Sequence, residues 1–138
     1  MKILGLDLGD VWIGSAISDP LGITCKPYKT VKLEELEDFI ETTIKEELIG
    51  TVVVGKPITM KGKDSEQTAK VVELANKLEQ KFSQVNKRLV KWIMWDERFS
   101  SKRASELAKS TKEDKLLNHA RAAAFILQTY LDHKAMMR

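Results

Sequence analysis

The sequence predicts a single α/β domain over residues 1–138, with a five-stranded mixed sheet flanked by helices. Three strand-like segments separated only by turn residues come first, and two further strand-like segments then alternate with helical patterns. Strands joined by short turns form an antiparallel meander, whereas strands joined through helices run parallel. We therefore expect a three-strand antiparallel meander continued by two parallel strands. A chain of 138 residues has the length of one domain and can bury a full core.

The first three strands follow from residue alternation and turn signals. Residues 2–9, KILGLDLG, are largely apolar on both faces, which is typical of a central strand. A Gly-Asp turn then leads to a second strand over residues 11–18. A third strand is expected over residues 23–31. Its Pro27 lacks a backbone N–H, so this strand should lie at a sheet edge.

A helix, a buried strand and a second helix come next. Apolar side chains recur every three or four residues over residues 33–48, which predicts a helix. The run GTVVVG over residues 50–55 is typical of a buried parallel strand. Asp64, with Gln67 three residues later, forms a capping box, so a helix is expected from there to about Phe82.

The C-terminal third completes the pattern. Residues 88–95, RLVKWIMW, predict the last strand. A short helix is expected over residues 100–109, and a final helix from Thr111 to about Asp132 with a frayed tail beyond it. With right-handed crossovers, this order of elements is a ribonuclease-H-like arrangement. Seven apolar residues of the final helix are predicted to face inward: Leu116, Ala120, Ala123, Ile126, Leu127, Tyr130 and Leu131.

Charge is unevenly distributed along the chain. The net charge is +3, but residues 34–47 hold seven acidic residues and one lysine, a local −6, which leaves +9 elsewhere. A basic remainder favours a polyanionic partner, although a solvated helix and scattered surface lysines give the same composition. Cys25 is the single cysteine, which excludes an internal disulfide. No apolar run reaches the ~20 residues that span a bilayer, so we expect a cytoplasmic protein without membrane contact.

Carboxylates follow two of the predicted parallel strands at the point where each strand ends. Asp7 closes the first strand, and Asp96 and Glu97 close the last. Because the carboxyl ends of parallel strands meet at one sheet edge, these side chains are expected together. Carboxylate oxygens suit Mg²⁺, and two such ions can drive phosphodiester hydrolysis. The alternative is that Asp7 is a turn residue and that Asp96, Glu97 and Arg98 form a surface ion-pair cluster.

Five motifs follow one another along the whole chain: Gly5-Leu6-Asp7-Leu8-Gly9, Ile13-Gly14 with Ser18-Asp19, Val54-Gly55-Lys56-Pro57 with Met60 and Gly62, Asp96-Glu97-Arg98-Phe99-Ser100, and Ala122–Leu131. In this order and spacing the chain resembles the YqgF/RuvX family of Holliday-junction-resolvase-like nucleases. The resemblance implies a ribonuclease-H-like fold and a metal-dependent nuclease that matures the 5′ end of pre-16S ribosomal RNA. It also implies catalytic roles for Asp7, Asp96 and Glu97.

One candidate site position departs from the family pattern. The family usually carries an aspartate early in the last helix, where this chain has His119. Imidazole binds first-row transition metals better than Mg²⁺, so a metal-ligand role for His119 would favour Mn²⁺. A general base is a second interpretation, because imidazole exchanges protons near neutral pH. In a third interpretation, His119 is hydrogen-bonded to a helix end or to Asp96, and metal binding at the site is weakened.

Basic and aromatic residues near the same edge are candidates for nucleic-acid contact. Lys56, Lys61 and Lys63 flank the loop before the second helix, and a helix start with lysines can hold a phosphate. Arg98 can contact a phosphate bidentately, and Trp12 can stack on a base. The alternatives are solvated loop lysines and a tryptophan that packs at the sheet edge.

The resemblance implies a nucleic-acid partner, either pre-ribosomal RNA in ribosomal precursor particles or branched DNA. It also implies a divalent metal, Mg²⁺ or Mn²⁺, and a homodimer if the substrate is a two-fold junction. The absence of the family aspartate leaves a second interpretation open, a non-cleaving RNA-binding factor in ribosome assembly. A third interpretation is a phosphate-binding loop like that of sugar kinases and actin, at Leu6-Asp7-Leu8-Gly9. Such proteins place two domains around a nucleotide, whereas 138 residues make only one domain.

Overall fold

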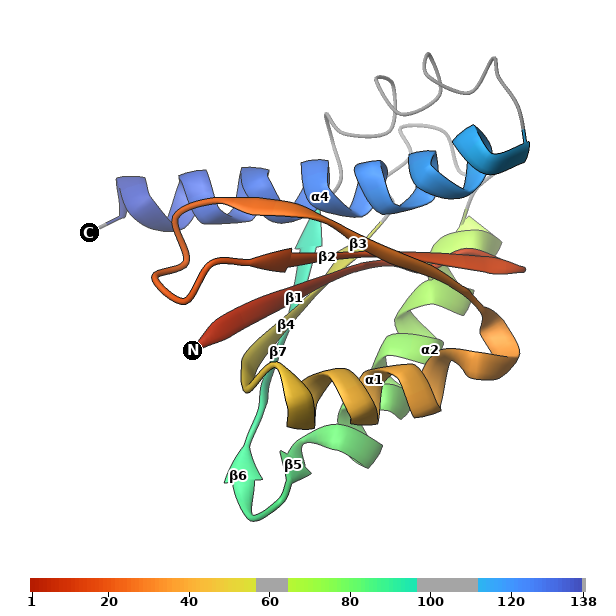
Figure 1. The fold of residues 1–138 in the computed structure, drawn as a ribbon. Coiled ribbons are helices and arrows are strands. Elements are labelled where there is room, and N and C mark those ends of the chain that lie inside the picture. Colours follow the sequence, from red (N-terminus) through yellow and green to blue (C-terminus); the bar gives the residue numbers. More distant parts are fainter. Residues whose placement is uncertain (57–64, 97–111, 138) are drawn as a thin grey trace.

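The fold is seen in a computed structural model that describes residues 1–56, 65–96 and 112–137 (Figure 1). Its main sheet has five strands in the order β3-β2-β1-β4-β7. The strands are β1 (Lys2–Asp7), β2 (Trp12–Ser18), β3 (Cys25–Lys32), β4 (Ile49–Lys56) and β7 (Lys91–Asp96).

β1 is the central strand, as its apolar residues on both faces predict. It pairs antiparallel with β2 and parallel with β4, and β4 pairs parallel with β7. β3 pairs with β2 and is the terminal strand on that side, in agreement with the edge position predicted from Pro27. The predicted sheet, a three-strand meander plus two parallel strands, is therefore confirmed.

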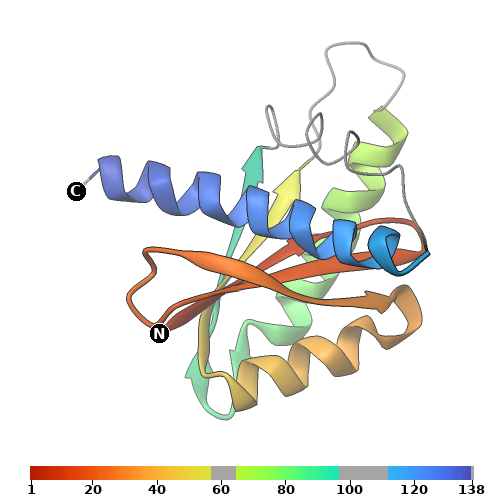
Figure 2. The same ribbon diagram turned by 45° about the horizontal axis from the view of Figure 1, so that its top comes forward.

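Helices cover both faces of this sheet. The 3-10 turn η1 (Leu33–Glu35), α1 (Leu36–Glu46) and α2 (Ser65–Phe82) lie on one face, and α4 (Lys112–Met136) crosses the other (Figures 1 and 2). Six of the seven apolar residues predicted to face inward from α4 are buried, and Leu116 is half-buried. The expectation that the helix ends near Asp132 was wrong, because α4 continues for one further turn.

Side chains alternate along β1 between two hydrophobic clusters, one on each face of the sheet. Leu4 and Leu6 belong to the cluster shared with α1 and α2. Ile3 belongs to the smaller cluster shared with Leu127 of α4. Each such side chain contributes about 1.5–3 kcal/mol when fully buried. The same alternation places Asp7, the last residue of β1, on the α4 face.

Two glycines let α4 lie close to β1 and β2. A Cβ added to Gly5 would lie only 2.9 Å from the Cβ of Leu127. A Cβ added to Gly14 would overlap the backbone carbonyl of His119. The backbone of α4 around His119 therefore rests on β2, with no side chain between them.

Polar contacts tie α4 to strands across the sheet. The Thr30 hydroxyl on β3 donates to the carbonyl of Leu116, near the start of the helix. The Cys25 thiol, also on β3, donates to the carbonyl of Ala124 at 3.1 Å. On β7, the indole N–H of Trp95 donates to the hydroxyl of Thr129 at 2.9 Å. The helix is thus held to both edge strands of the sheet.

The single strand predicted over residues 88–95 was wrong in its first part. Gln84–Val85 and Arg88–Leu89 form a separate antiparallel hairpin, β5 and β6, before β7 begins. Its two turn residues, Asn86 and Lys87, have φ values of 52° and 63°, as a tight two-residue hairpin turn requires. Asn tolerates this conformation, but a turn without glycine gives a weak sequence signal.

Arg88 fixes the hairpin to the end of α1. Its guanidinium donates to the carbonyl of Ile44 at 3.1 Å and to the carbonyl of Ile49. Leu48, between these two carbonyls, has a positive φ of 54°, the conformation that ends many helices. A side chain from the hairpin thus satisfies carbonyl groups where α1 gives way to β4.

Parts of the predicted pattern fall outside the described residues. These are the helix over residues 100–109, the helix starts at Asp64 and Thr111, and the candidate site residues Lys61, Lys63, Glu97 and Arg98. Among the helices that the structure describes, none combines the length and apolarity needed to cross a membrane.

The Gly14 contact gives a prediction about stability. Gly14→Ala places a methyl group against the His119 carbonyl, and backbone at that point moves only if α4 shifts. We expect a loss of about 3 kcal/mol or more in the free energy of unfolding, measured by urea denaturation. Gly50→Ala is the matched control, because the three atoms nearest to its added Cβ all belong to the flexible Met1 side chain. Equal losses in both variants would contradict the close packing of α4.

Cys25 gives a prediction about pH. Burial raises the pKa of its thiol from 9.0 to about 11, with a smaller contribution from Asp132. The folded state therefore holds the thiol proton more tightly than the unfolded state. This contribution to stability is complete below about pH 9 and is lost as the pH rises toward 11.

Two measurements check this. Iodoacetamide should alkylate Cys25 far more slowly at pH 8 in the folded protein than in urea. In Cys25→Ser, the free energy of unfolding measured in urea should fall less between pH 9 and pH 11 than it does in the wild-type protein. Equal alkylation rates in both states would show that the thiol is not held by burial.

Candidate active site

Asp7 is a candidate site residue whose backbone belongs to the central strand of the sheet. It is the last residue of the central strand β1, is half-buried, and pairs with Gly14 of β2. Its side chain lies on the α4 face, two positions beyond Gly5. A carboxylate here stands at the sheet edge where the carboxyl ends of the parallel strands meet, as the sequence predicts.

The ends of β4 and β7 lie at the same edge. Leu6 pairs with Val54, and Lys56 pairs with Asp96, so the carboxyl ends of β1, β4 and β7 are level. Since β4 lies between the other two strands, Asp7 and Asp96 are two strands apart, about 10 Å between backbones. Asp7 and Asp96 therefore end strands at the same sheet edge.

Asp96, however, belongs to the opposite face of the sheet from Asp7. The preceding residue, Trp95, faces α4, because its ring contacts that of Tyr130 edge-on at 5.5 Å between centroids. Alternation along β7 then directs Asp96 toward the α2 face. Lys56 shares that face, because Val54, two residues before it, lies in the cluster with α1 and α2.

His119 lies at the Asp7 edge, on the α4 face. It belongs to the first third of α4 and is half-buried. Its carbonyl sits against Gly14, which is the residue that pairs with Asp7. The backbone of His119 is thus one strand away from Asp7, close to where the sequence analysis expected the histidine.

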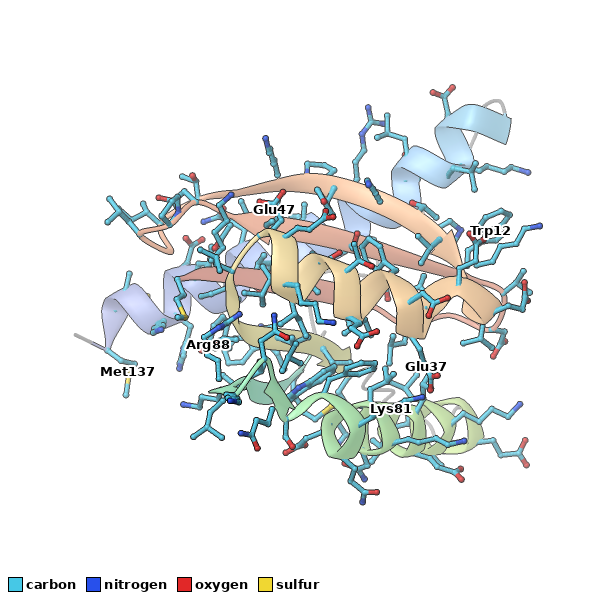
Figure 3. The ribbon with its side chains drawn as sticks, turned by 60° about the horizontal axis from the view of Figure 1, so that its bottom comes forward. Trp12, Glu37, Glu47, Lys81, Arg88 and Met137 are labelled. Carbon is cyan, nitrogen blue, oxygen red and sulfur yellow. The ribbon has the colours of Figure 1, made fainter. Side chains whose placement is uncertain are left out.

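Trp12 lies on the same face, at the start of β2. It is two residues from Gly14, so it is a diagonal neighbour of Asp7, within about 7–8 Å of it. The ring is half-buried, and the ammonium of Lys32 lies 5.7 Å from its centroid. Figure 3 shows Trp12 at one end of the sheet and Arg88 toward the other. The structure therefore brings Asp7, the His119 segment and Trp12 together.

The described residues do not by themselves form a metal site. Within residues 1–56, 65–96 and 112–137, no three His, Cys, Asp or Glu side chains form a group that could hold a metal ion. Asp7 offers hard oxygen donors and His119 a nitrogen donor, which suits a divalent cation. A complete ligand set needs a further carboxylate, and the candidate Glu97 lies outside the described residues.

Asp19, directly after the end of β2, has a structural role. Asp19, in the turn between β2 and β3, accepts hydrogen bonds from the backbone N–H groups of Ile23 and Thr24 at 2.7 and 3.0 Å. The bond from Thr24 is the main cause that lowers the pKa of this carboxyl. Asp19 therefore shapes a turn at the sheet end opposite Asp7.

A pocket of about 280 Å³, which the sequence does not predict, lies between the β1–β2 turn and α2. Its lining includes Leu8 and Asp10 from the β1–β2 turn, Leu33 from η1, and Leu74 and Lys77 from α2. These residues come from three separate parts of the chain. No local sequence pattern signals a cavity assembled in this way.

Comparisons with known proteins agree with this architecture. A family model described as "RuvX: Holliday junction resolvase" matches residues 1–133. A protein of Sulfurihydrogenibium sp. is 37% identical over 136 residues, covering 95% of this chain and 90% of the relative. A protein of Clostridium tetani is 38% identical over 141 residues, covering 96% of each. Both relatives are named "Putative pre-16S rRNA nuclease".

Solved structures show the same fold. RuvC of Thermus thermophilus aligns with a TM-score of 0.57 at 10% identity, covering 99% of this chain and 97% of that one. The same protein in complex with a Holliday junction substrate aligns with a TM-score of 0.58 at 11% identity, covering 98% and 96%. At such identities the likeness concerns the fold alone, which is the ribonuclease-H-like fold predicted from the order of elements.

Proposed function

Because the chain belongs to the RuvX family, we propose that it hydrolyses phosphodiester bonds of nucleic acid in the 5′-end processing of pre-16S ribosomal RNA. The names of its relatives support this substrate. The observation that carries the proposal is Asp7, a half-buried carboxylate that ends the central strand beneath α4. A carboxylate at this position can hold the divalent cation that phosphodiester hydrolysis uses.

For the site itself, we propose that Asp7 and Glu97 hold a divalent cation, with His119 as a third donor. Such a cation would activate a water molecule and offset the charge that develops on the leaving oxygen. The orientation of Asp96 toward the α2 face favours Glu97 as the ligand rather than Asp96. Asp7 anchors the site because the hydrogen-bonded strands on both sides of β1 fix its backbone.

Nucleic-acid contacts are proposed on both sides of this edge. Trp12 offers part of its ring to a base on the α4 face. Phosphates would be contacted by Lys56 at the end of β4, and by Lys61, Lys63 and Arg98, which lie outside the described residues. Phosphate contacts of this kind position the substrate and leave the choice of cleavage position to other interactions.

A non-cleaving RNA-binding role is the second candidate. It is favoured by His119, which stands where the family usually has an aspartate. One carboxylate fewer at the edge weakens the attraction for Mg²⁺. Branched DNA is the second candidate substrate, on the description of the matching family.

Asp7→Asn tests the site. Removing a direct metal ligand should cost more than the roughly 10–100-fold that loss of an outer-shell partner costs. The readout is the cleavage rate of a labelled pre-16S leader fragment and of a four-way DNA junction, each in Mg²⁺ and in Mn²⁺. The substrate cut faster identifies the substrate class.

Asp96→Asn is the matched control, because it removes a carboxylate from the same sheet edge but the opposite face. We expect a smaller loss of cleavage than in Asp7→Asn. Equal losses in both variants would contradict the assignment of the faces. RNA binding without cleavage in the wild-type protein would establish the non-cleaving role.

His119→Asp tests the third donor. The wild-type protein should cleave faster in Mn²⁺ than in Mg²⁺, because imidazole favours first-row transition metals. Aspartate at position 119 replaces nitrogen with oxygen, so the ratio of the Mg²⁺ rate to the Mn²⁺ rate should rise. His119→Ala separates this from a purely steric effect. An unchanged ratio in both variants would remove His119 from the metal site.

A further inference from the structure

The edge strand β3 carries an unusual concentration of positive charge. Its sequence, CKPYKTVK, contains three lysines and no acidic residue. Lys26, Lys29 and Lys32 are all exposed. At the other edge, β7 reads KWIMWD, and its lysine and aspartate cancel. Lysine on an edge strand also prevents aggregation, but that need applies to both edges and does not explain the difference.

One end of this lysine row reaches the candidate active site. Lys32 pairs with Trp12 across the strands, and its ammonium lies 5.7 Å from the centroid of the Trp12 ring. Trp12 is in turn the diagonal neighbour of Asp7 on the α4 face. From Lys32 to Lys26 the strand extends away from this edge over about 20 Å. The three lysines therefore follow the outer rim of the sheet, but they do not share one face. Lys32 lies beside Trp12 on the α4 face, whereas Lys26 pairs with Ile17, which belongs to the cluster on the α1 and α2 face.

The acidic residues of the neighbouring helix and its C-terminal end form their ion pairs with lysines outside β3. Ion pairs join Lys2 to Glu47 at 2.8 Å and Lys81 to Glu37 at 2.7 Å. A third, Lys45 to Glu41, lies within α1. None of these three ion pairs among the described residues includes a lysine of β3.

Two of the β3 lysines also act electrostatically on a neighbouring carboxyl group. The pKa of the Glu47 carboxyl is lowered, first by its hydrogen bond to Lys2 and then, more weakly, by Lys26 and Lys29. Lys29 also lies 5.2 Å from the centroid of the Tyr28 ring. Tyr28 packs against Phe39 of α1 at 6.0 Å between ring centroids, so this part of β3 is fixed to the hydrophobic core.

We propose that the β3 edge binds the phosphodiester backbone of single-stranded RNA through Lys26, Lys29 and Lys32 and directs the strand over Trp12 to Asp7. This inference rests on the proposed nuclease function and names the surface that holds the substrate outside the cleavage site. Three exposed ammonium groups along one sheet edge can each neutralise a phosphate of an extended nucleic-acid strand. An acidic protein would meet the same lysines, but it would not need Trp12 beside them.

The test replaces the three lysines together by glutamine. Each lost phosphate contact should lower the slope of log K against log salt by about 0.7, or about 2 for the triple variant. Near 0.1 M salt the affinity for a labelled single-stranded leader RNA should fall on the order of 10- to 100-fold. Binding is measured by fluorescence anisotropy, with Asp7→Asn present in every protein so that the RNA is not cleaved during the measurement.

The matched control replaces Lys77, Lys91 and Lys134 by glutamine. These exposed lysines lie on α2, β7 and α4, and their loss changes the net charge equally. A loss of affinity in the β3 variant that clearly exceeds the loss in the control supports the proposal. Equal losses would show an effect of net charge alone and would overturn it.

A second measurement does not depend on variants. Acetylation of lysines by an N-hydroxysuccinimide ester, read by mass spectrometry, should slow at Lys26, Lys29 and Lys32 when the RNA is added. Lys77 and Lys91 should react unchanged. Protection of the control lysines alone would overturn the proposal. So would unchanged RNA binding in the triple variant with loss of binding to ribosomal precursor particles, because it would assign the edge to a protein.

The cleavage assay separates this proposal from the proposed function. If both are correct, the triple variant raises KM and leaves kcat within about threefold, whereas Asp7→Asn lowers kcat at unchanged affinity. Loss of RNA affinity only in the triple variant, with no effect of Asp7→Asn on cleavage, would overturn the active site and keep the RNA-binding edge. The reverse result would keep the active site and overturn the edge.

Discussion

The contact between the backbone of α4 and the central strands fixes the geometry on which the rest of the structure depends. Gly5 and Gly14 have no side chains to hold the helix away, so Leu127 and the His119 carbonyl lie directly on β1 and β2. Hydrogen bonds from Cys25 and Trp95 then hold the helix to both sheet edges. Because Gly14 pairs with Asp7, the same contact that packs the helix also brings its histidine to the candidate site.

Most of the sheet could be predicted because the signals are local. Apolar residues on both faces mark β1 as central, and Pro27 marks β3 as an edge. The β5–β6 hairpin could not be predicted, since its Asn86-Lys87 turn lacks glycine and its anchor is remote. Arg88 holds it by hydrogen bonds to Ile44 and Ile49, about forty residues earlier in the chain. Contacts of that separation leave no trace in periodicity.

For the site, the sequence predicts the edge but not the face. Asp7 and Asp96 both follow strands, and parallel pairing brings both to one end of the sheet. Which face each residue takes depends on the packing of its neighbours. In the run WIMWD every residue before the aspartate is apolar, so the pattern does not show whether Trp95 or Met94 faces α4. The hydrogen bond of Trp95 to Thr129 decides it, and Asp96 is turned away from Asp7 as a consequence.

The two faces of the sheet carry different groups of candidate residues at this edge. The α4 face gathers Asp7, the His119 segment and Trp12, and Lys32 joins Trp12 to the basic rim of β3. A substrate strand that follows the rim would arrive at Asp7 from the β2 side, because Trp12 and Asp7 are diagonal neighbours. Lys56, on the other face, would then meet the nucleic acid beyond the site. Such a path would place Asp7 between two groups of phosphate contacts, which is the arrangement that holds a scissile phosphate in position.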